Sequence, residues 1–170
     1  MVVWFIGLSG AGKTTLATKL VSHLRESRKD VVFLDGDILR DVWGDDTDHT
    51  IQGREKNAKR ISNLCKSLDQ QGLNVVASVL SIFPEWQKWN RENFSQYFEI
   101  FLDVSMDILI ERDTKGLYKK ARKGEIKNVV GIDIEFPTPP SPDMILSDWS
   151  DDETPDKSIE RIINSLPNIK

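Results

Sequence analysis

The chain has 170 residues, of which 39% are hydrophobic and 29% are charged, and its formal net charge is −4. It is long enough to bury the core of one α/β domain, and it contains no apolar run long enough to cross a bilayer. The acidic balance lacks the basic footprint needed to hold polymeric nucleic acid. We therefore expect a single domain over residues 1–170 that has neither a membrane nor a polymeric nucleic acid as partner.

Residues 2–6 (V-V-W-F-I) form an apolar run of strand length that leads directly into a glycine-rich turn. The first residues lack the basic start, long apolar stretch and small-residue cleavage site of a signal peptide, so we expect the protein in the cytoplasm. The segment after the turn, T-T-L-A-T-K-L-V-S-H-L, has helical spacing. The sequence thus predicts a strand, a loop and a helix in that order.

The turn itself, residues 7–14, reads G-L-S-G-A-G-K-T and matches the pattern G-x-x-x-x-G-K-[ST]. Its glycines let successive N–H groups point at phosphate oxygens, and the following helix adds the positive end of its dipole. Lys13 would bridge the β- and γ-phosphates of ATP, and Thr14 would offer its hydroxyl to Mg²⁺. The loop residues assigned to ATP are Gly7, Ser9, Gly10, Ala11, Gly12, Lys13, Thr14 and Thr15. The alternative, a turn that binds nothing, is disfavoured by the Lys-Thr pair in this context.

Four later apolar runs complete a predicted sheet. They cover residues 31–34, 73–80, 99–104 and 144–147, and residues 52–70 carry apolar positions at helical intervals. Strands that alternate with helices predict an α/β fold with a doubly wound, five-stranded parallel sheet and flanking helices. The ligand of such a sheet lies beyond the carboxyl ends of the strands.

Asp35 and Asp37 follow the second predicted strand, at the edge of the sheet where the glycine loop also lies. One of them could accept a proton from an attacking hydroxyl, as phosphoryl transfer requires. Taken alone, the Asp-Gly-Asp sequence is at least as typical of a plain turn.

Two segments differ from this framework. Residues 112–128 carry many cations in an otherwise acidic chain and predict a basic lid, whose closing cations would exclude water and stabilise transferred charge. A solvated run of charge is the alternative interpretation. The proline-rich residues 136–142 predict a stiff connection without regular structure.

The motifs are far more specific in combination. In chain order they are G-L-S-G-A-G-K-T-T, L-D-G-D-x-x-R, R-E-K-N, R-D-x-K-G-L-Y-K-K-A-R-x-G-E-I-K-N and G-I-D. This order resembles the adenylylsulfate (APS) kinases over roughly residues 2–146. The resemblance implies a P-loop kinase that uses ATP and Mg²⁺ and transfers the γ-phosphoryl group to the 3′-hydroxyl of a nucleotide's ribose.

The resemblance also implies roles on the side of the acceptor, the small-molecule nucleotide that receives the phosphoryl group. Asp37 matches the residue that orients or deprotonates the acceptor hydroxyl, with Asp35 nearby. Arg40, Arg54 and Asn57 match positions that hold the acceptor nucleotide. For Arg54 and Asn57 the alternative is a solvated helix face.

Three further roles come from the same resemblance. Lys115 lies in the lid and would face phosphates during catalysis, and Arg112 is assigned to ATP. Ser81 falls at a serine that can be phosphorylated in some members of the family. We expect Ser81 to bind the acceptor by position or hydrogen bonding, because a P-loop kinase can transfer directly between two bound substrates.

The sequence departs from the family at the acceptor site. His49 and Val129 stand where the family has two phenylalanines that flank the adenine of the acceptor, and Pro84 stands in place of the usual arginine. Because stacking on an aromatic face contributes on the order of 1–3 kcal/mol per base, adenine binding should be weaker. The sequence resembles a branch of the family that phosphorylates cytidine diphosphoramidate in capsule modification. We place this acceptor ahead of APS, which stays the alternative.

Two other classes of function are weighed. A nucleotide-dependent switch would hydrolyse ATP or GTP slowly to change its affinity for a partner, but the acceptor-side motifs have no role in a pure switch. A catalytically dead binding module is disfavoured because Lys13, Thr14 and Asp37 are retained. The resemblance is also compatible with a homodimer.

Overall fold

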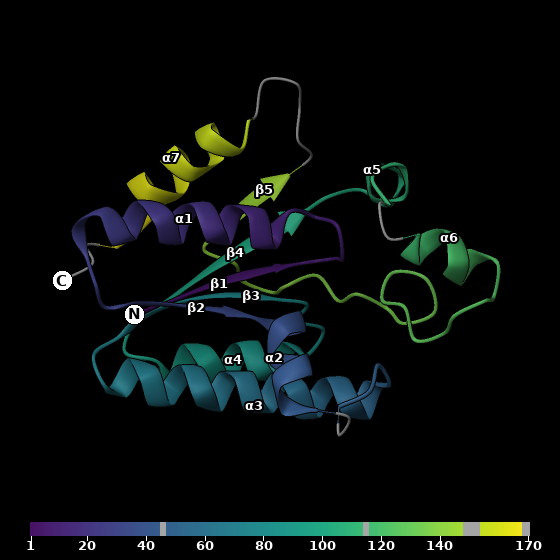
Figure 1. Cartoon of the computed structure of the whole chain (residues 1–170), viewed down its shortest axis with the longest axis horizontal. Helices are drawn as coiled ribbons and strands as arrows, with labels where there is room; N and C mark the ends of the chain where they lie inside the picture. The colour runs from purple at the N-terminus through teal and green to yellow at the C-terminus, as the bar shows by residue number, and fades with distance from the viewer. Residues whose placement is uncertain (45–46, 114–115, 148–153, 168–170) are drawn as a thin grey trace.

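The computed structural model describes residues 1–44, 47–113, 116–147 and 154–167. A five-stranded parallel sheet with the strand order β2-β3-β1-β4-β5 lies between two helical layers (Figure 1). This arrangement confirms the doubly wound parallel sheet that the sequence predicts. Among the described residues, no helix is both long enough and apolar enough to cross a membrane.

All five predicted strands are present, and their ends differ from the expected ones by at most two residues. They are β1 (Val2–Gly7), β2 (Val31–Asp35), β3 (Asn74–Val79), β4 (Tyr97–Asp103) and β5 (Met144–Ser147). Every residue of β1 and β3 is buried, because helices cover both faces of a parallel sheet. Alternate residues of β1 serve different cores: Val3 and Phe5 pack on one face, and Trp4 packs on the other.

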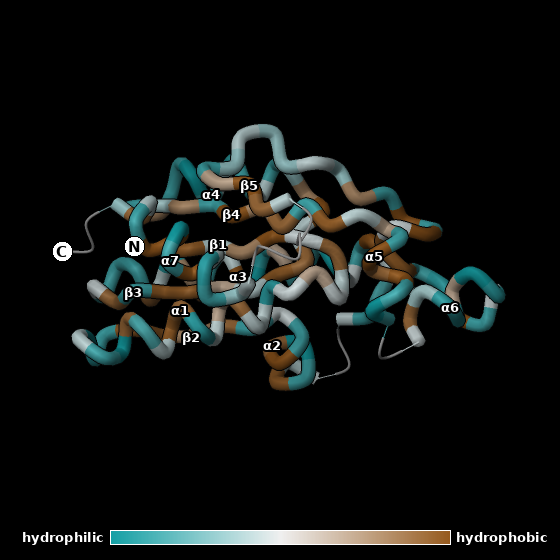
Figure 2. The backbone as a smooth tube through the Cα atoms, turned by 90° about the horizontal axis from the view of Figure 1, so that it is seen from above, coloured by the Kyte–Doolittle hydropathy of each residue, from teal (hydrophilic) through white to brown (hydrophobic). Residues whose placement is uncertain are grey.

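Helices α1 (Lys13–Ser27) and α7 (Pro155–Ser165) cover one face of the sheet. The other face is covered by α2 (Gly36–Trp43), α3 (Ile51–Gln70) and α4 (Pro84–Asn93). Two short helices, α5 (Met106–Glu111) and α6 (Leu117–Arg122), extend beyond the carboxyl ends of the strands, away from the sheet (Figures 1 and 2). The proline-rich residues 136–142 have no regular structure, as expected.

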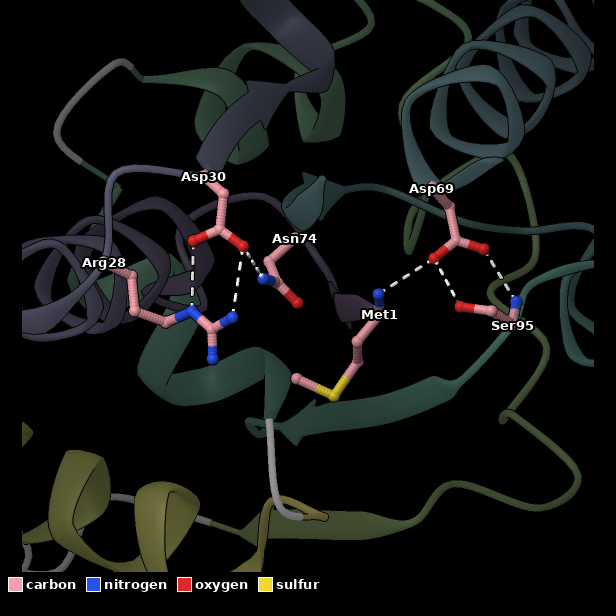
Figure 3. Close-up of polar contacts among 6 residues, drawn as sticks. All are labelled: Met1, Arg28, Asp30, Asp69, Asn74 and Ser95. Carbon is pink, nitrogen blue, oxygen red and sulfur yellow. Dashed lines mark hydrogen bonds and ion pairs between the residues drawn. The ribbon is translucent and has the colours of Figure 1, made fainter. Parts of the chain in front are cut away.

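Polar contacts connect the segments at the amino-terminal ends of the strands, opposite the ends where the ligand of such a sheet lies (Figure 3). Asp69, at the end of α3, accepts hydrogen bonds from the Met1 ammonium group at 2.9 Å and from Ser95 N and Oγ at 2.7 Å each. Asp30 is held by Arg28 and by Asn74 Nδ2 at 3.1 and 2.7 Å. These contacts join the starts of β1, β2, β3 and β4, so we expect the residues at this edge to stabilise the fold.

Candidate active site

The glycine-rich loop connects β1 to α1 as the motif predicts, and it brings together all eight loop residues assigned to ATP. Gly12 adopts φ 95° immediately before α1, a left-handed conformation that favours glycine. No side chain caps the start of α1, so the N–H groups of its first turn remain available to an anion. Gly7 allows close packing on β4, since a Cβ there would lie 2.9 Å from the Leu102 carbonyl oxygen.

Lys13 folds back over the loop, where its Nζ donates to the Leu8 carbonyl oxygen at 2.8 Å. Burial lowers the Lys13 pKa to about 8, although the carboxylates of Asp37 and Asp35 act in the opposite direction. The two carboxylates predicted at the acceptor side therefore lie within electrostatic reach of the loop lysine. A phosphate beside Lys13 would raise the pKa again and keep the lysine charged.

Thr14 contacts two oxygen-bearing side chains from neighbouring strands. Its Oγ1 donates to Asp35 Oδ2 at 2.7 Å and lies 3.2 Å from Ser78 Oγ. Oxygen ligands are those that Mg²⁺ prefers, and this ion commonly takes only one or two of them from protein, with phosphates and water for the rest. The residues around Thr14 therefore fit a magnesium ion.

Asp35 also starts α2. It caps this helix by accepting hydrogen bonds from the N–H groups of Asp37 and Ile38 at 2.9 and 3.4 Å. The Asp-Gly-Asp segment is thus a helix start and not a plain turn. Asp37 is exposed in the first turn of α2, beside the loop.

Arginines on two helices hold the loop that leads into α3. Arg40, on α2, donates to the carbonyl oxygens of Thr47 and Asp48 at 2.8 Å each. Arg54, on α3, donates from Nε to the His49 carbonyl oxygen at 2.9 Å. Both arginines, which were assigned to the acceptor from sequence, thus also position this loop.

The charges of this region act on one another. Burial lowers the His49 pKa, and the cations of Arg40 and Arg54 lower it further. Burial also lowers the Arg54 pKa, and the positive charge of Arg40 lowers it further, while the negative charge of Asp37 acts in the opposite direction. The fold therefore gathers four residues predicted on the acceptor side, from α2, the following loop and α3.

Val129 reaches this region from the far end of the chain. Arg54 Nη2 donates to the Asn128 carbonyl oxygen at 2.8 Å, and the Asp133 carboxylate accepts from the N–H groups of Asn128 and Val129. The side chain of Val129 is 4% exposed and belongs to the main core cluster. Arg54 thus joins the backbone at His49 to the backbone next to Val129.

The remaining acceptor-side predictions concern two buried residues. Ser81 lies just after β3, and its Oγ accepts a hydrogen bond from Gln87 Nε2 at 3.3 Å. Asn57 is buried in the second turn of α3, and its Oδ1 has no partner among the residues that the structure describes.

The described part of the predicted lid, residues 112–113 and 116–128, contacts the phosphate loop. Tyr118, on α6, is 2% exposed and donates from its hydroxyl to the Ser9 carbonyl oxygen at 2.7 Å. Burial raises the Tyr118 pKa to about 12, so this hydroxyl stays protonated as a donor. Arg112 is exposed at the end of α5, and Lys115 lies outside the described residues.

Sequence reasoning assigned no role to four residues that the structure places in or beside the site: Ser78, Gln87, Tyr118 and Asp133. Ser78 had a signal, because it is a polar residue inside an apolar strand. Tyr118 and Asp133 lie within the quoted motifs. Gln87 had no signal beyond its place in a segment that departs from the family pattern.

Comparison with known proteins gives four matches that each cover most of the chain: one family model, two relatives and one solved structure. A family model described as Adenylylsulphate kinase matches residues 1–147. The cytidine diphosphoramidate kinase of Campylobacter jejuni is 38% identical over 97% of this chain and 95% of that protein. The adenylyl-sulfate kinase of Pseudomonas aeruginosa is also 38% identical, over 97% of this chain and 84% of that protein. The solved structure of the Mycobacterium tuberculosis APS kinase CysC in complex with AMPPNP and APS is 33% identical, with a TM-score of 0.88 over 96% of this chain and 95% of that one.

Proposed function

Because the chain belongs to the adenylylsulphate kinase family and is an ATP-dependent nucleotide 3′-kinase, we propose that its acceptor is cytidine diphosphoramidate, used in capsule modification. The observation that carries this proposal is the replacement of both family phenylalanines by His49 and Val129. The nearly end-to-end match to the Campylobacter jejuni enzyme supports it.

The surroundings of the two replaced positions favour a small base. Val129 offers only a small exposed aliphatic surface, because Asp133 holds its backbone and its side chain packs in the core. His49 supplies a polar ring, and Arg54 holds the backbone of this residue by donating to its carbonyl oxygen. Loss of two aromatic faces weakens stacking, which matters more for a purine than for the smaller ring of a pyrimidine.

In the proposed reaction the 3′-hydroxyl oxygen of the acceptor attacks the γ-phosphorus of ATP. The bond between that phosphorus and the β,γ-bridging oxygen breaks, the new phosphorus–oxygen bond forms, and ADP leaves. Asp37, exposed beside the loop, orients the hydroxyl and accepts its proton. Lys13 and the first turn of α1 stabilise the negative charge on the phosphates.

Magnesium would be held at the Thr14 hydroxyl, near Asp35 and Ser78, and would neutralise charge on the β- and γ-phosphates. The lid helix α6 would close the site over the nucleotide, since Tyr118 already attaches it to the Ser9 carbonyl. Exclusion of water by this closure would prevent transfer of the phosphoryl group to water.

The test is a comparison of kcat/KM for cytidine diphosphoramidate and APS at equal Mg-ATP, with products identified by phosphorus NMR. We expect the wild-type enzyme to prefer the cytidine nucleotide and the His49→Phe/Val129→Phe variant to shift toward APS. His49→Phe alone is the companion variant, because a phenylalanine at the buried position 129 can strain the core. A wild-type preference for APS would overturn the proposal.

Adenylylsulfate is the second candidate acceptor. The adenylyl-sulfate kinase of Pseudomonas aeruginosa is as similar in identity, 38%, as the cytidine diphosphoramidate kinase. The same acceptor comparison decides between the two, because both reactions use the same ATP site and differ only in the nucleotide that receives the phosphoryl group.

A further inference from the structure

Two buried amide oxygens lie among residues that the sequence assigns to the acceptor: one is on Asn57 itself, and the other is on Gln87, which contacts Ser81. Gln87 Oε1 and Asn57 Oδ1 have no hydrogen-bond partner among the residues that the structure describes. Their side chains are only 3% and 5% exposed. Burial of an amide oxygen without a donor costs free energy, so a buried oxygen of this kind in a binding site indicates a ligand that donates a hydrogen bond.

The fold places the two amides on neighbouring helices. Gln87 lies in the first turn of α4, just after Ser81, and Asn57 lies in the second turn of α3, which packs against α4. Ala58, next to Asn57, shares one apolar cluster with Ile82 and with Val130. The segment after β3, the start of α3 and the loop near residue 130 are therefore contiguous.

Gln87 Nε2 donates a hydrogen bond to Ser81 Oγ at 3.3 Å. The nitrogen is used by the protein, and the oxygen is left as an acceptor. Gln87 also lies in the segment where Pro84 replaces the family's arginine, so this region offers a neutral acceptor in a place where the family pattern has a cation.

The unpaired groups of the site include both a hydrogen-bond donor and hydrogen-bond acceptors, and these suit different parts of a ligand. Arg40 Nε is a buried donor without a partner among the described residues, and it suits a phosphate oxygen. An amide oxygen repels phosphate and sulfate oxygens, which are acceptors only, but it accepts from an N–H group. Gln87 therefore suits an acceptor nucleotide whose terminal group carries hydrogen.

We propose that Gln87 is a specificity-determining residue that accepts a hydrogen bond from an amine on the distal phosphoryl group of a nucleoside diphosphate, with Asn57 as a second acceptor. This inference rests on the proposed function, because it explains how the same site would tell a phosphoramidate from a plain phosphate or a sulfate. A terminal sulfate or phosphate would leave both amide oxygens without a donor.

The experiment measures kcat/KM for cytidine diphosphoramidate and for CDP, which has oxygen in place of the terminal amine, with the wild type and Gln87→Met at equal Mg-ATP. Methionine has a similar length and no amide. We expect the wild type to favour the amidate by about 10- to 100-fold in kcat/KM. The variant should lose most of this preference because its kcat/KM for the amidate falls while its kcat/KM for CDP changes little. Loss of folded protein lowers both reactions equally and cancels in the ratio.

Two further variants complete the test. Gln70→Met changes an exposed glutamine at the far end of α3 and should leave the ratio unchanged. Gln87→Glu keeps an acceptor oxygen and should retain the preference for the amidate. Gln87→Leu also removes the acceptor and replaces Gln87→Met if that variant does not fold. An unchanged ratio in folded Gln87→Met would overturn the inference while the proposed function stands. If the wild type phosphorylates neither cytidine nucleotide, the proposed function fails and the inference fails with it.

Discussion

At the edge of the sheet where the strands begin, both carboxylate oxygens of Asp69 accept hydrogen bonds, and Asp30 is held by two partners (Figure 3). At the edge where the strands end, Arg40 Nε, Asn57 Oδ1 and Gln87 Oε1 are buried without a partner among the described residues. Both edges belong to one sheet and carry polar side chains of similar kinds. The two carboxylates named at the first edge are satisfied by the protein itself, and the three atoms named at the second are not.

This difference separates stability from function. A buried polar group that is fully hydrogen-bonded holds segments in one arrangement, whereas an unsatisfied one costs free energy in the unliganded protein. The cost can be recovered when a ligand supplies the missing partner. Substitutions at the first edge should therefore change stability, and substitutions at the second should change catalysis or substrate choice.

The largest effect is expected at Lys13. Lys13→Ala removes a cation from the phosphate loop and should lower kcat by at least about 10³-fold, because charge on the transferred group is no longer stabilised. Lys19→Ala is the matched control on the same helix, since Lys19 is exposed and pairs with Asp156 at 2.6 Å. Steady-state kinetics and a thermal unfolding curve measure both variants, and near-normal turnover by Lys13→Ala would contradict the assignment.

Asp37→Asn should lower kcat by roughly 10²–10⁴-fold, because the amide cannot accept the proton of the acceptor hydroxyl. The affinity for ATP, measured by titration calorimetry, should change little. Asp41→Asn, an exposed position on the same helix, is the control. If ATP binding collapses while kcat persists, Asp37 belongs to the metal site and its proposed role is wrong.

Asp69→Asn tests the opposite edge. It should lower the free energy of unfolding by roughly 1–3 kcal/mol, because a charged acceptor of three hydrogen bonds is replaced by a neutral amide. Values of kcat and KM should stay close to those of the wild type. A large loss of activity in the folded variant would show that the two edges are not separate in function.

The same carboxylate predicts a dependence of stability on pH. Burial alone would raise the Asp69 pKa, but hydrogen bonds from the Met1 ammonium and from Ser95 give a net lowering from the ordinary value of 3.8. A pKa lowered in the folded state stabilises the protein above the unfolded value, and this contribution is lost as the pH falls through the folded value. Unfolding curves below about pH 4 should therefore converge for the wild type and Asp69→Asn.

The smallest effect is expected for a pair of tyrosines, one at each edge. Tyr118→Phe removes the hydrogen bond from the lid helix to the Ser9 carbonyl and should raise KM for ATP by roughly 2- to 10-fold with little change in stability. Tyr97→Phe removes the bond to the buried Glu99 and should lower the melting temperature while leaving KM unchanged. The opposite pattern in either variant would contradict the division between the edges.

Much of the active site was predictable because its signals are local. The phosphate loop is a run of consecutive residues whose glycines, Lys13 and Thr14 act through neighbouring backbone groups, so the pattern determines the chemistry. The five strands follow from continuous apolar runs, and Asp37 follows from its place after one of them. The proposed change of the acceptor site rests on His49 and Val129, two positions at which the sequence departs from the family pattern.

Other features were decided by the tertiary structure, because they join residues that are far apart in the chain. Thr14 meets Ser78 across 64 positions, and the Arg54 guanidinium reaches the Asn128 carbonyl across 74. No spacing in the sequence encodes such contacts, since they exist only after parallel strands bring their carboxyl ends to one edge. The fold class and the phosphate-loop motif were readable from local patterns in the chain. Whether a buried polar group has a hydrogen-bond partner depends on the packed helices, because they exclude water and position the possible partners.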